Sequence, residues 1–459
     1  MTRWTALCLG LLATSTVCVA ADPATGPQAW REQGRALFQG EAGWQQSPTL
    51  AGVALPAQAS ACARCHGPGG QGGQEAGVSV PPLQAGSSER AARLVAMAES
   101  GHRVDGRALS APMPRYRLND NERRALVAYL SVFGTEEEPV RGVDAQRIVL
   151  GALLPDSGPR AAVGQAVLAG LRNHFDELSR SGGVYGRRVD VVALPWNGDR
   201  PASELAAWLR VRLPGTPVLA LVGSFVGDLE PDVVRQLAEL RLPLLANLGP
   251  AMLDGGAGAP PGWVSSLLPS VQSQLRQSVQ AFDERCPSTT GAALDVRLGD
   301  VPGLQEAVRR GLAGRSLHVG AHATAVREQR PRRVLALQSA SDTDALRQTL
   351  HEGDCLWTLA MFSGIGARQS AAQELLTLPS QAALPQPARQ PQSLWQGLGR
   401  LAGQLASETL SRAGRRLQPE MLVQVQAALD PFEPTAGVQM ELSRTRRHAL
   451  PVTTLWRTP

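Results

Sequence analysis

The chain has 459 residues, a formal net charge of +5, 43% apolar and 19% charged residues. This length exceeds what one hydrophobic core usually serves, so we expect at least two domains, and the apolar fraction excludes a largely disordered chain. The small charge excess and the 4% aromatic content supply neither the basic surface nor the stacking side chains typical of nucleic-acid binding, so no nucleic-acid partner is expected.

Residues 1–21 resemble a secretory signal peptide. Arg3 precedes an apolar run over residues 6–19, and small residues follow it. The run is shorter than a membrane-spanning helix needs, and no later apolar stretch reaches its length, so we expect no membrane span. Val17 before Cys18 disfavours a lipoprotein. The segment therefore predicts export to the periplasm, with an N-terminal core helix as the alternative.

The strongest motif is Cys62-Ala63-Arg64-Cys65-His66. Two thiols at this spacing can each add to one vinyl group of a haem, and the adjacent histidine then reaches the iron as an axial ligand. A zinc site would need a second pair of ligands, and a thiol redox pair would need a strand before it and a helix after it. Neither accompanies the motif. It therefore predicts one covalently bound haem c.

A second axial ligand to the iron is expected downstream. Met97 falls in a predicted helix over residues 89–100, where a core position is expected, and His102 follows that helix. Met113 stands between two prolines, which exclude helix and stiffen the loop. A thioether ligand raises the reduction potential, which suits an electron carrier. We expect His66 and Met113 to be the axial ligands.

Two helices should frame this site. Residues 28–39 place apolar side chains on one face, and Gly34 would let a second helix approach closely. Asn119, with Glu122 three residues later, is an N-cap signature for a helix that runs to Phe133. We predict that these two helices cross beside the haem.

On these motifs, residues 28–134 resemble the class I cytochrome c family, and Cys62, Cys65, His66 and Met113 fall on its haem and axial positions. Segments 105–107 and 112–116 look like those of monohaem cytochromes that serve periplasmic dehydrogenases. The resemblance implies a small all-α cytochrome c domain over residues 22–138 and redox partner proteins: a dehydrogenase as donor, a cytochrome or oxidase as acceptor.

Arginines flank the segment that carries Met113, and their role is open between contact with haem propionates, contact with a redox partner and a solvated rim. They are Arg103, Arg107, Arg115 and Arg117.

An acidic, Pro- and Gly-containing stretch predicts a linker at residues 139–145. The chain after it, residues 146–459, alternates strand and helix signals, which predicts a parallel α/β fold. Expected strands lie at 148–150, 189–194, 218–222, 243–247, 333–338 and 356–360, and expected helices at 161–179 and 202–211.

This second part resembles type I periplasmic solute-binding proteins, the amide and branched-chain amino-acid receptors of ABC transporters. Residues 148–159, 164–166 and 181–187 look like the opening of that family, and 413–417 and 446–448 look like its end. The resemblance implies a two-lobed α/β fold that holds a small organic ligand between its lobes. Loop groups at strand ends would bind that ligand. The candidate contacts are Ser157, Gly158 and Ser224, with ordinary loop capping as the alternative for the serines.

The sequence departs from this family at the expected binding loops. Residues 223–227 and 247–251 stand where amino-acid receptors usually offer Ser or Thr, so the hydroxyl clamp is thinned. Residues 286–300 show no convincing strand, which predicts a shortened second lobe.

Two further patterns are a pair of cysteines and a pair of histidines in the second part of the chain. Cys286 and Cys355 could form a disulfide or remain free thiols, since spacing does not fix connectivity. His318 and His322 have the spacing of one helical face, but Gly320 weakens such a helix and no third ligand is evident nearby. We therefore expect surface histidines there, not a metal site.

Two functions are compatible with these features. The first is a periplasmic electron carrier whose second domain serves docking or ligand sensing. The alternative is a solute receptor for an amino acid or small organic ligand with a redox-responsive haem. An independent enzyme is not expected, because an iron with both axial positions filled offers no open site to a substrate.

Overall fold

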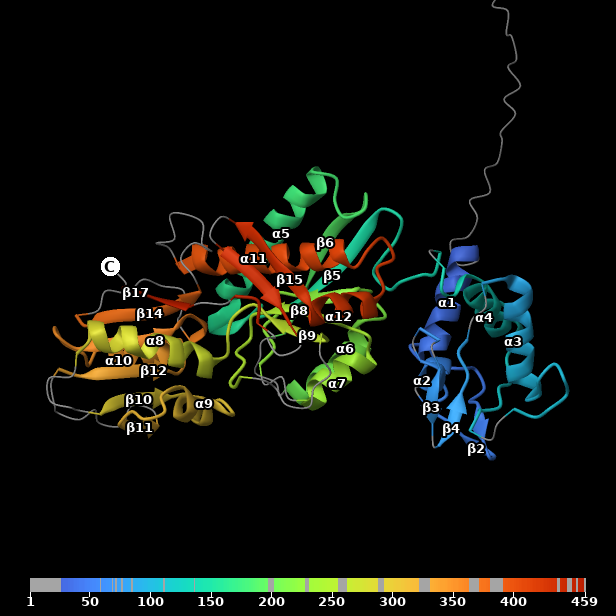
Figure 1. Cartoon of the computed structure of the whole chain (residues 1–459), viewed down its shortest axis with the longest axis horizontal. Helices are drawn as coiled ribbons and strands as arrows, with labels where there is room; N and C mark the ends of the chain where they lie inside the picture. The colour runs from blue at the N-terminus through green and yellow to red at the C-terminus, as the bar shows by residue number, and fades with distance from the viewer. Residues whose placement is uncertain are drawn as a thin grey trace, which may run out of the picture. The chain divides into compact units, whose positions relative to one another are not determined.

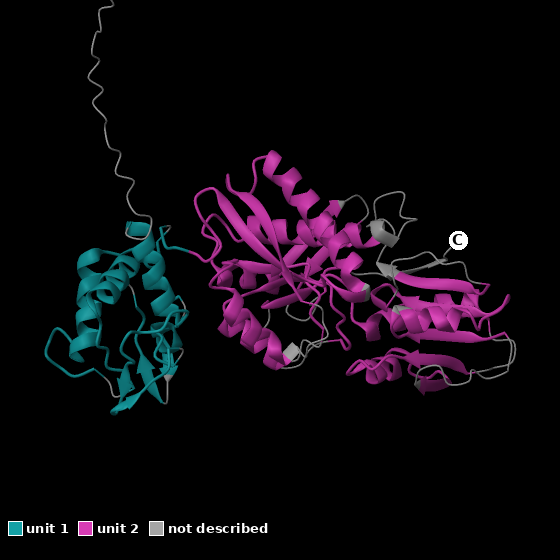
Figure 2. Cartoon of the chain, turned by 180° about the vertical axis from the view of Figure 1, so that it is seen from behind, with its two compact units in different colours: residues 1–139 teal, residues 140–459 magenta. Residues whose placement is uncertain are grey.

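The structure is a computed structural model that describes residues 26–457, except 58, 68, 71, 76, 84–85, 110–111, 136, 197–201, 228–230, 255–261, 288–292, 322–330, 363–370, 380–390, 436–437, 444–447 and 451–452. The predicted signal peptide, residues 1–21, lies outside the described residues. The chain divides into two compact units, unit 1 over residues 1–139 and unit 2 over residues 140–459 (Figure 2). No helix in the described ranges combines the length and hydropathy of a membrane span.

Unit 1 is a small helical domain with two short antiparallel ladders. Its helices are α1 (Pro27–Gln39), α2 (Cys62–His66), α3 (Ser88–Ser100) and α4 (Asp120–Val132). Strand β1 (Thr49–Leu50) pairs with β2 (Val53–Ala54), and β3 (Gly73–Glu75) pairs with β4 (Val78–Val80).

The close approach of α1 and α4 confirms the predicted helix crossing (Figure 1). A Cβ atom on Gly34 would lie 2.1 Å from the carbonyl oxygen of Ala125, so the two backbones meet where Gly34 has no side chain. Beside this contact the Phe38 ring centroid lies 4.9 Å from that of Phe133. The predicted capping box at Asn119 is also present and begins α4.

Unit 2 contains two mainly parallel sheets with helices. The first sheet has the order β6-β5-β7-β8-β9, and all its neighbouring strands are parallel. These strands are β5 (Arg147–Leu154), β6 (Arg188–Pro195), β7 (Ala220–Val222), β8 (Leu244–Asn247) and β9 (Val264–Ser266). The helices of this part are η1 (Gly158–Arg160), α5 (Ala161–Arg180), η2 (Ala202–Glu204), α6 (Leu205–Arg212) and α7 (Pro231–Glu239).

The second sheet has the order β11-β10-β12-β13-β14-β17, with only β17 antiparallel to its neighbour. Its strands are β10 (Leu294–Leu298), β11 (Leu317–Ala321), β12 (Arg333–Leu337), β13 (Cys355–Leu359), β14 (Gln373–Pro379) and β17 (Thr453–Arg457). The remaining elements are α8 (Val271–Arg285), α9 (Leu304–Gly311), α10 (Ala340–Arg347), η3 (Ala360–Phe362), α11 (Pro391–Arg412), α12 (Pro419–Ala427) and the hairpin β15 (Leu429–Thr435) and β16 (Val438–Leu442).

Strand β10 corrects the expectation that residues 286–300 contain no strand. Leu294 and Val296 face the core, but Asp295 and Arg297 on the other face are also buried, which hides the usual alternation of apolar and polar side chains. The Asp295 carboxylate accepts a hydrogen bond from Nδ1 of His318 over 3.0 Å. The second lobe is therefore not shortened at this strand.

The structure decides the pairing of Cys286 and Cys355 and places one of the two histidines. Cys286, at the end of α8, forms a disulfide with Cys355 at the start of β13. His318 lies on strand β11, so it belongs to no helical face, and His322 lies outside the described residues.

The predicted linker at residues 139–145 is held at both of its ends. The Glu138 carboxylate accepts hydrogen bonds from the Tyr129 hydroxyl (2.9 Å) and the Gly134 amide (3.0 Å), both in unit 1. Arg141 donates to backbone carbonyls of unit 2, including that of Val218 at 3.0 Å. Val140 packs against the unit 2 core. The residues after Pro139 are therefore part of unit 2.

Helices α5 and α11 of unit 2 cross at glycines, as α1 and α4 do in unit 1. A Cβ on Gly170 would lie 2.0 Å from the carbonyl oxygen of Gln396, and one on Gly403 would lie 2.7 Å from Cδ2 of His174. The His174 ring thus packs against α11, and its Nε2 lies 2.8 Å from the Ser407 hydroxyl.

Replacing Gly34 by alanine should destabilise unit 1 by about 1–3 kcal/mol, because the new Cβ cannot be accommodated without separating α1 from α4. Hydrogen–deuterium exchange of α1 and α4 in the full chain measures this loss. Gly43→Ala is the matched control, since nothing lies within 4 Å of its Cβ position. Equal protection in the two variants would contradict the crossing.

Burial, with the nearby Arg400 guanidinium, lowers the pKa of His174 to about 4 from an ordinary 6.5. The unfolded chain therefore binds this proton more readily than the folded one, and unit 2 should lose stability as the pH falls from 6.5 towards 4. The melting temperature should therefore change less with pH over that range for His174→Gln than for the parent. The same substitution at the exposed His351 serves as control, and identical slopes for both variants would rule out His174 as the source.

Candidate functional site

Unit 1 contains a partly open, mainly apolar cavity of about 560 Å³. Helix α1 supplies Phe38, α3 supplies Leu94 and Val95, and α4 supplies Leu126 and Leu130. Strand β4 and the prolines after it close another side, and the loop before α4 provides the rest of the wall. This volume is within the range of about 300–1,000 Å³ found for small-molecule and cofactor sites.

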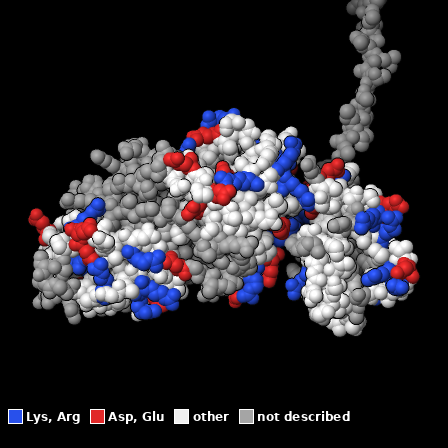
Figure 3. Space-filling model, in the orientation of Figure 1, with Lys and Arg blue, Asp and Glu red and all other residues white. Residues whose placement is uncertain are grey.

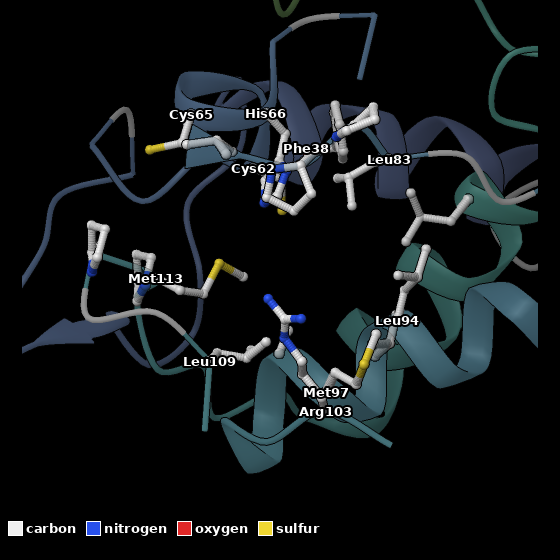
Figure 4. A pocket seen from close by; sticks show the side chains of 18 of the residues that line it. Phe38, Cys62, Cys65, His66, Leu83, Leu94, Met97, Arg103, Leu109 and Met113 are labelled. Carbon is white, nitrogen blue, oxygen red and sulfur yellow. The ribbon is translucent and has the colours of Figure 1, made fainter. Parts of the chain in front are cut away.

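His66 ends α2 and points its ring into this cavity (Figure 4). The side chain is 7% exposed, and Nδ1 lies 2.9 Å from the carbonyl oxygen of Pro81. A carbonyl oxygen only accepts hydrogen bonds, so Nδ1 carries the proton and Nε2 keeps its lone pair for a metal. Burial lowers the pKa of His66, which favours this neutral form, although the bond to Pro81 acts in the opposite direction.

Cys62 and Cys65 line the same cavity one helical turn apart. Both thiols are free of any disulfide. Burial raises the pKa of the Cys62 thiol to about 11, and a hydrogen bond with Tyr116 offsets part of that rise. The Tyr116 hydroxyl also donates to the Ser60 carbonyl over 2.6 Å, which fixes the ring beside α2. Cys62 is therefore protonated at neutral pH.

Met113 reaches the cavity from the loop before α4, and Figure 4 shows its sulfur pointing inward. The flanking Pro112 and Pro114 line the cavity too, while Ala111 lies outside the described residues. His102 does not line it: its ring is exposed and its Nδ1 lies 2.9 Å from the Ser100 carbonyl oxygen. Met97, expected in the core, is on the cavity wall.

The structure thus brings Cys62, Cys65, His66 and Met113 to one cavity. Sequence reasoning missed the wall formed by residues 78–83 and the carbonyl that orients His66. No local signal marks Pro81 as a hydrogen-bond partner of a residue 15 positions earlier.

The cavity fits a haem by the chemistry of its walls and donors. No group of three or more His, Cys, Asp or Glu in the described part of the chain could hold a metal ion by itself. The His66 imidazole and the Met113 thioether are the two kinds of donor that haem iron takes in electron-transfer cytochromes. Apolar walls suit the faces of such a ring, and two thiols at this spacing suit its vinyl groups.

The candidate ligand contacts of unit 2 have different surroundings. Ser224 is fully buried, and its Oγ accepts from the Leu153 amide over 3.0 Å and donates to the Val222 carbonyl over 3.3 Å. Its hydroxyl is therefore used within the fold. Ser157 and Gly158 are exposed at the start of η1.

The loops after β7 and β8 are bonded to each other. Asn247 is fully buried, its Oδ1 accepts from the Val226 amide over 3.1 Å, and its Nδ2 donates to the Val226 carbonyl over 2.8 Å. A Cβ on Gly249 would lie 2.1 Å from that same carbonyl oxygen. Between these loops and α11, the Phe225 and Trp395 ring centroids are 5.5 Å apart. Polar groups at these strand ends thus serve the protein's own backbone.

Positive and negative side chains are interspersed over much of the described surface that Figure 3 shows. Many of them form ion pairs, for example Arg123 with Glu99 at 2.9 Å in unit 1 and Arg400 with Glu177 at 2.6 Å in unit 2. This surface offers no large region of one sign for steering a partner over long distances.

Residues 50–130 match the model of a protein family described as cytochrome c oxidase, cbb3-type, subunit III. Curated proteins contain no match to the chain.

Solved structures similar to this chain include a possible leucine/isoleucine/valine-binding protein from Rhodopirellula baltica SH 1, with 16% identity, a TM-score of 0.52 and coverage of 69% of this chain and 97% of that one. An ABC transporter substrate-binding protein from Desulfitobacterium hafniense in complex with Leu has 16% identity, a TM-score of 0.52 and coverage of 68% and 98%. A branched-chain amino acid ABC transporter protein from Thermus thermophilus with bound valine has 14% identity, a TM-score of 0.52 and coverage of 69% and 94%. Identities this low show a shared fold alone.

Proposed function

Because the chain joins a cytochrome c domain to a domain with the two-lobed α/β fold of periplasmic solute-binding proteins, we propose that it is a periplasmic electron carrier with one covalently bound haem. The observation that carries this proposal is the convergence of two thiols, one imidazole and one thioether on a single apolar cavity. The expected donor is a periplasmic dehydrogenase, and the expected acceptor is a cytochrome or oxidase.

The residues of unit 1 divide the work between attachment, ligation and insulation. Cys62 and Cys65 would hold the haem through thioether bonds, and His66 and Met113 would be its axial ligands. When bound, haem iron supplies a one-electron couple between Fe(III) and Fe(II). The Pro81 carbonyl keeps the His66 ring in one orientation and one tautomer. The Met113 thioether favours the reduced state and raises the potential.

The apolar wall of the cavity contributes by keeping water away from the site. A site from which water is excluded changes little in structure or solvation when its charge changes. This property suits rapid electron transfer. If His66 and Met113 both ligated the iron, no open position would remain for a substrate. We therefore propose a carrier and not an independent enzyme.

Unit 2 is proposed to dock or position the partner proteins. The loops after β7 and β8 favour it over a ligand-binding role, because Ser224 and Asn247 use their polar atoms on the backbone, whereas Ser157 after β5 is exposed. The alternative, a receptor for an amino acid or small organic ligand with a redox-responsive haem, would need exposed polar groups at those strand ends.

Replacing Cys62 and Cys65 together by alanine should abolish covalent haem, because both attachment atoms are removed. Denatured mass spectrometry of protein expressed in a host with a c-type haem assembly system measures this directly. Parent protein should carry one haem mass after denaturation and the variant none. A parent without haem, or a variant that keeps it, would refute the proposal. A small molecule seen only in the native mass would favour the receptor alternative.

Met113→Ala should keep the covalent haem and lower the reduction potential, because the thioether that favours Fe(II) is lost. A redox titration followed by visible absorption gives the potential. Met97→Ala is the matched control, since Met97 lines the same cavity from α3. A potential that falls only in the Met97 variant, or in neither, would exclude Met113 as the axial ligand.

A further inference from the structure

Arg103 stands out among the residues that line the unit 1 cavity. Most of the other described lining residues are apolar. The exceptions are Ser79, Asp105 and the four residues proposed to attach or ligate the haem. Among the described residues that line the cavity, Arg103 is therefore the only permanently charged cation. Figure 4 shows its guanidinium directed into the cavity, between the side that holds Met113 and the side that holds Met97.

A tight turn fixes the backbone from which Arg103 projects. Its amide donates to the Arg107 carbonyl over 2.7 Å, and the Gly106 amide donates back to the Arg103 carbonyl over 2.9 Å. Gly106 has φ +81°, which suits a residue without a side chain at the turn. A bridge between His102 and Ala108 closes the base of the turn. The turn thus fixes the backbone position from which the Arg103 side chain extends.

The acidic side chain on this turn is committed to another arginine. Asp105 accepts a hydrogen bond from the Arg107 amide over 3.1 Å, and its carboxylate lies 3.8 Å from the Arg107 guanidinium. Across the described residues, Arg103 has no ion pair with a carboxylate. The Arg103 side chain is exposed at the mouth of the cavity, and the turn presents its positive charge there without an ion pair among the described residues.

The other arginines near the Met113 segment do not line the cavity. Arg107 is 81% exposed at its side chain, and Arg115 donates to the Gly101 carbonyl over 3.3 Å. Arg117 is exposed. The structure thus separates four arginines that the sequence could not rank.

We infer that Arg103 binds a propionate carboxylate of the haem, an assignment that rests on the proposed function. A haem combines an apolar ring with two carboxylates, and a carboxylate at an apolar wall is costly unless a cation and hydrogen-bond donors meet it. The planar guanidinium can donate two parallel hydrogen bonds to such a group. Its positive charge also favours the added electron, so Arg103 acts as a positioning residue that raises the potential.

The test compares three variants of the full haem-loaded chain: Arg103→Gln, Arg103→Lys and Arg107→Gln. Arg107→Gln removes the same charge from the same turn but from outside the cavity. Denatured mass spectrometry first confirms equal covalent haem in each. Redox titration then gives the potential, and resonance Raman spectra report the vibrations of the haem carboxylates.

Arg103→Gln should lower the potential further than Arg107→Gln and shift the carboxylate bands, and Arg103→Lys should recover part of the potential. Equal shifts for Arg103→Gln and Arg107→Gln with unchanged carboxylate bands would overturn the assignment while leaving the electron-carrier proposal intact. Absence of haem in the parent would instead overturn the proposed function itself.

Discussion

Each unit is held together by a crossing of two helices at a glycine. In unit 1 the backbone of α1 at Gly34 meets the Ala125 carbonyl of α4, and in unit 2 Gly170 of α5 meets the Gln396 carbonyl of α11. A side chain at either glycine would push two helices apart. In unit 1 this crossing also sets the cavity, because α1 supplies Phe38 and α4 supplies Leu130 to its wall. The shape of the site is thus decided by backbone contact several residues away from any group that does chemistry.

Within that cavity a few polar groups have defined tasks because everything around them is apolar. An imidazole held by one carbonyl, a thioether on a stiff loop and a guanidinium on a tight turn each arrive from a different element. Electrostatic effects are stronger beside apolar walls than in water. In the proposed haem site, a single charge or ligand would therefore tune the reduction potential, while the remaining lining only fills space.

The sequence predicted what is encoded locally and missed what depends on distant partners. The capping box of α4 is such a short pattern and is present in the structure. The motif of Cys62, Cys65 and His66 is equally local and lies on the cavity wall, where haem attachment stays a prediction. Strand β10 was missed because its charged side chains are buried by partners on other strands, such as His318. The expectation for Ser224 came from its place after a strand, whereas its actual bonds go to the backbone of β5 and β7. Such long-range pairings leave no periodic trace in the chain.

The short joint between the units limits how far apart their two anchored ends can lie. Glu138 is bound within unit 1 and Val140 packs in unit 2, so their Cα atoms, two residues apart, are separated by at most about 7.6 Å. A protein partner that captures either unit therefore keeps the other at high effective concentration beside it. A protease that separated the two units would have to cut at a segment whose neighbours on both sides are anchored. The two units therefore reach any partner together, as parts of one chain.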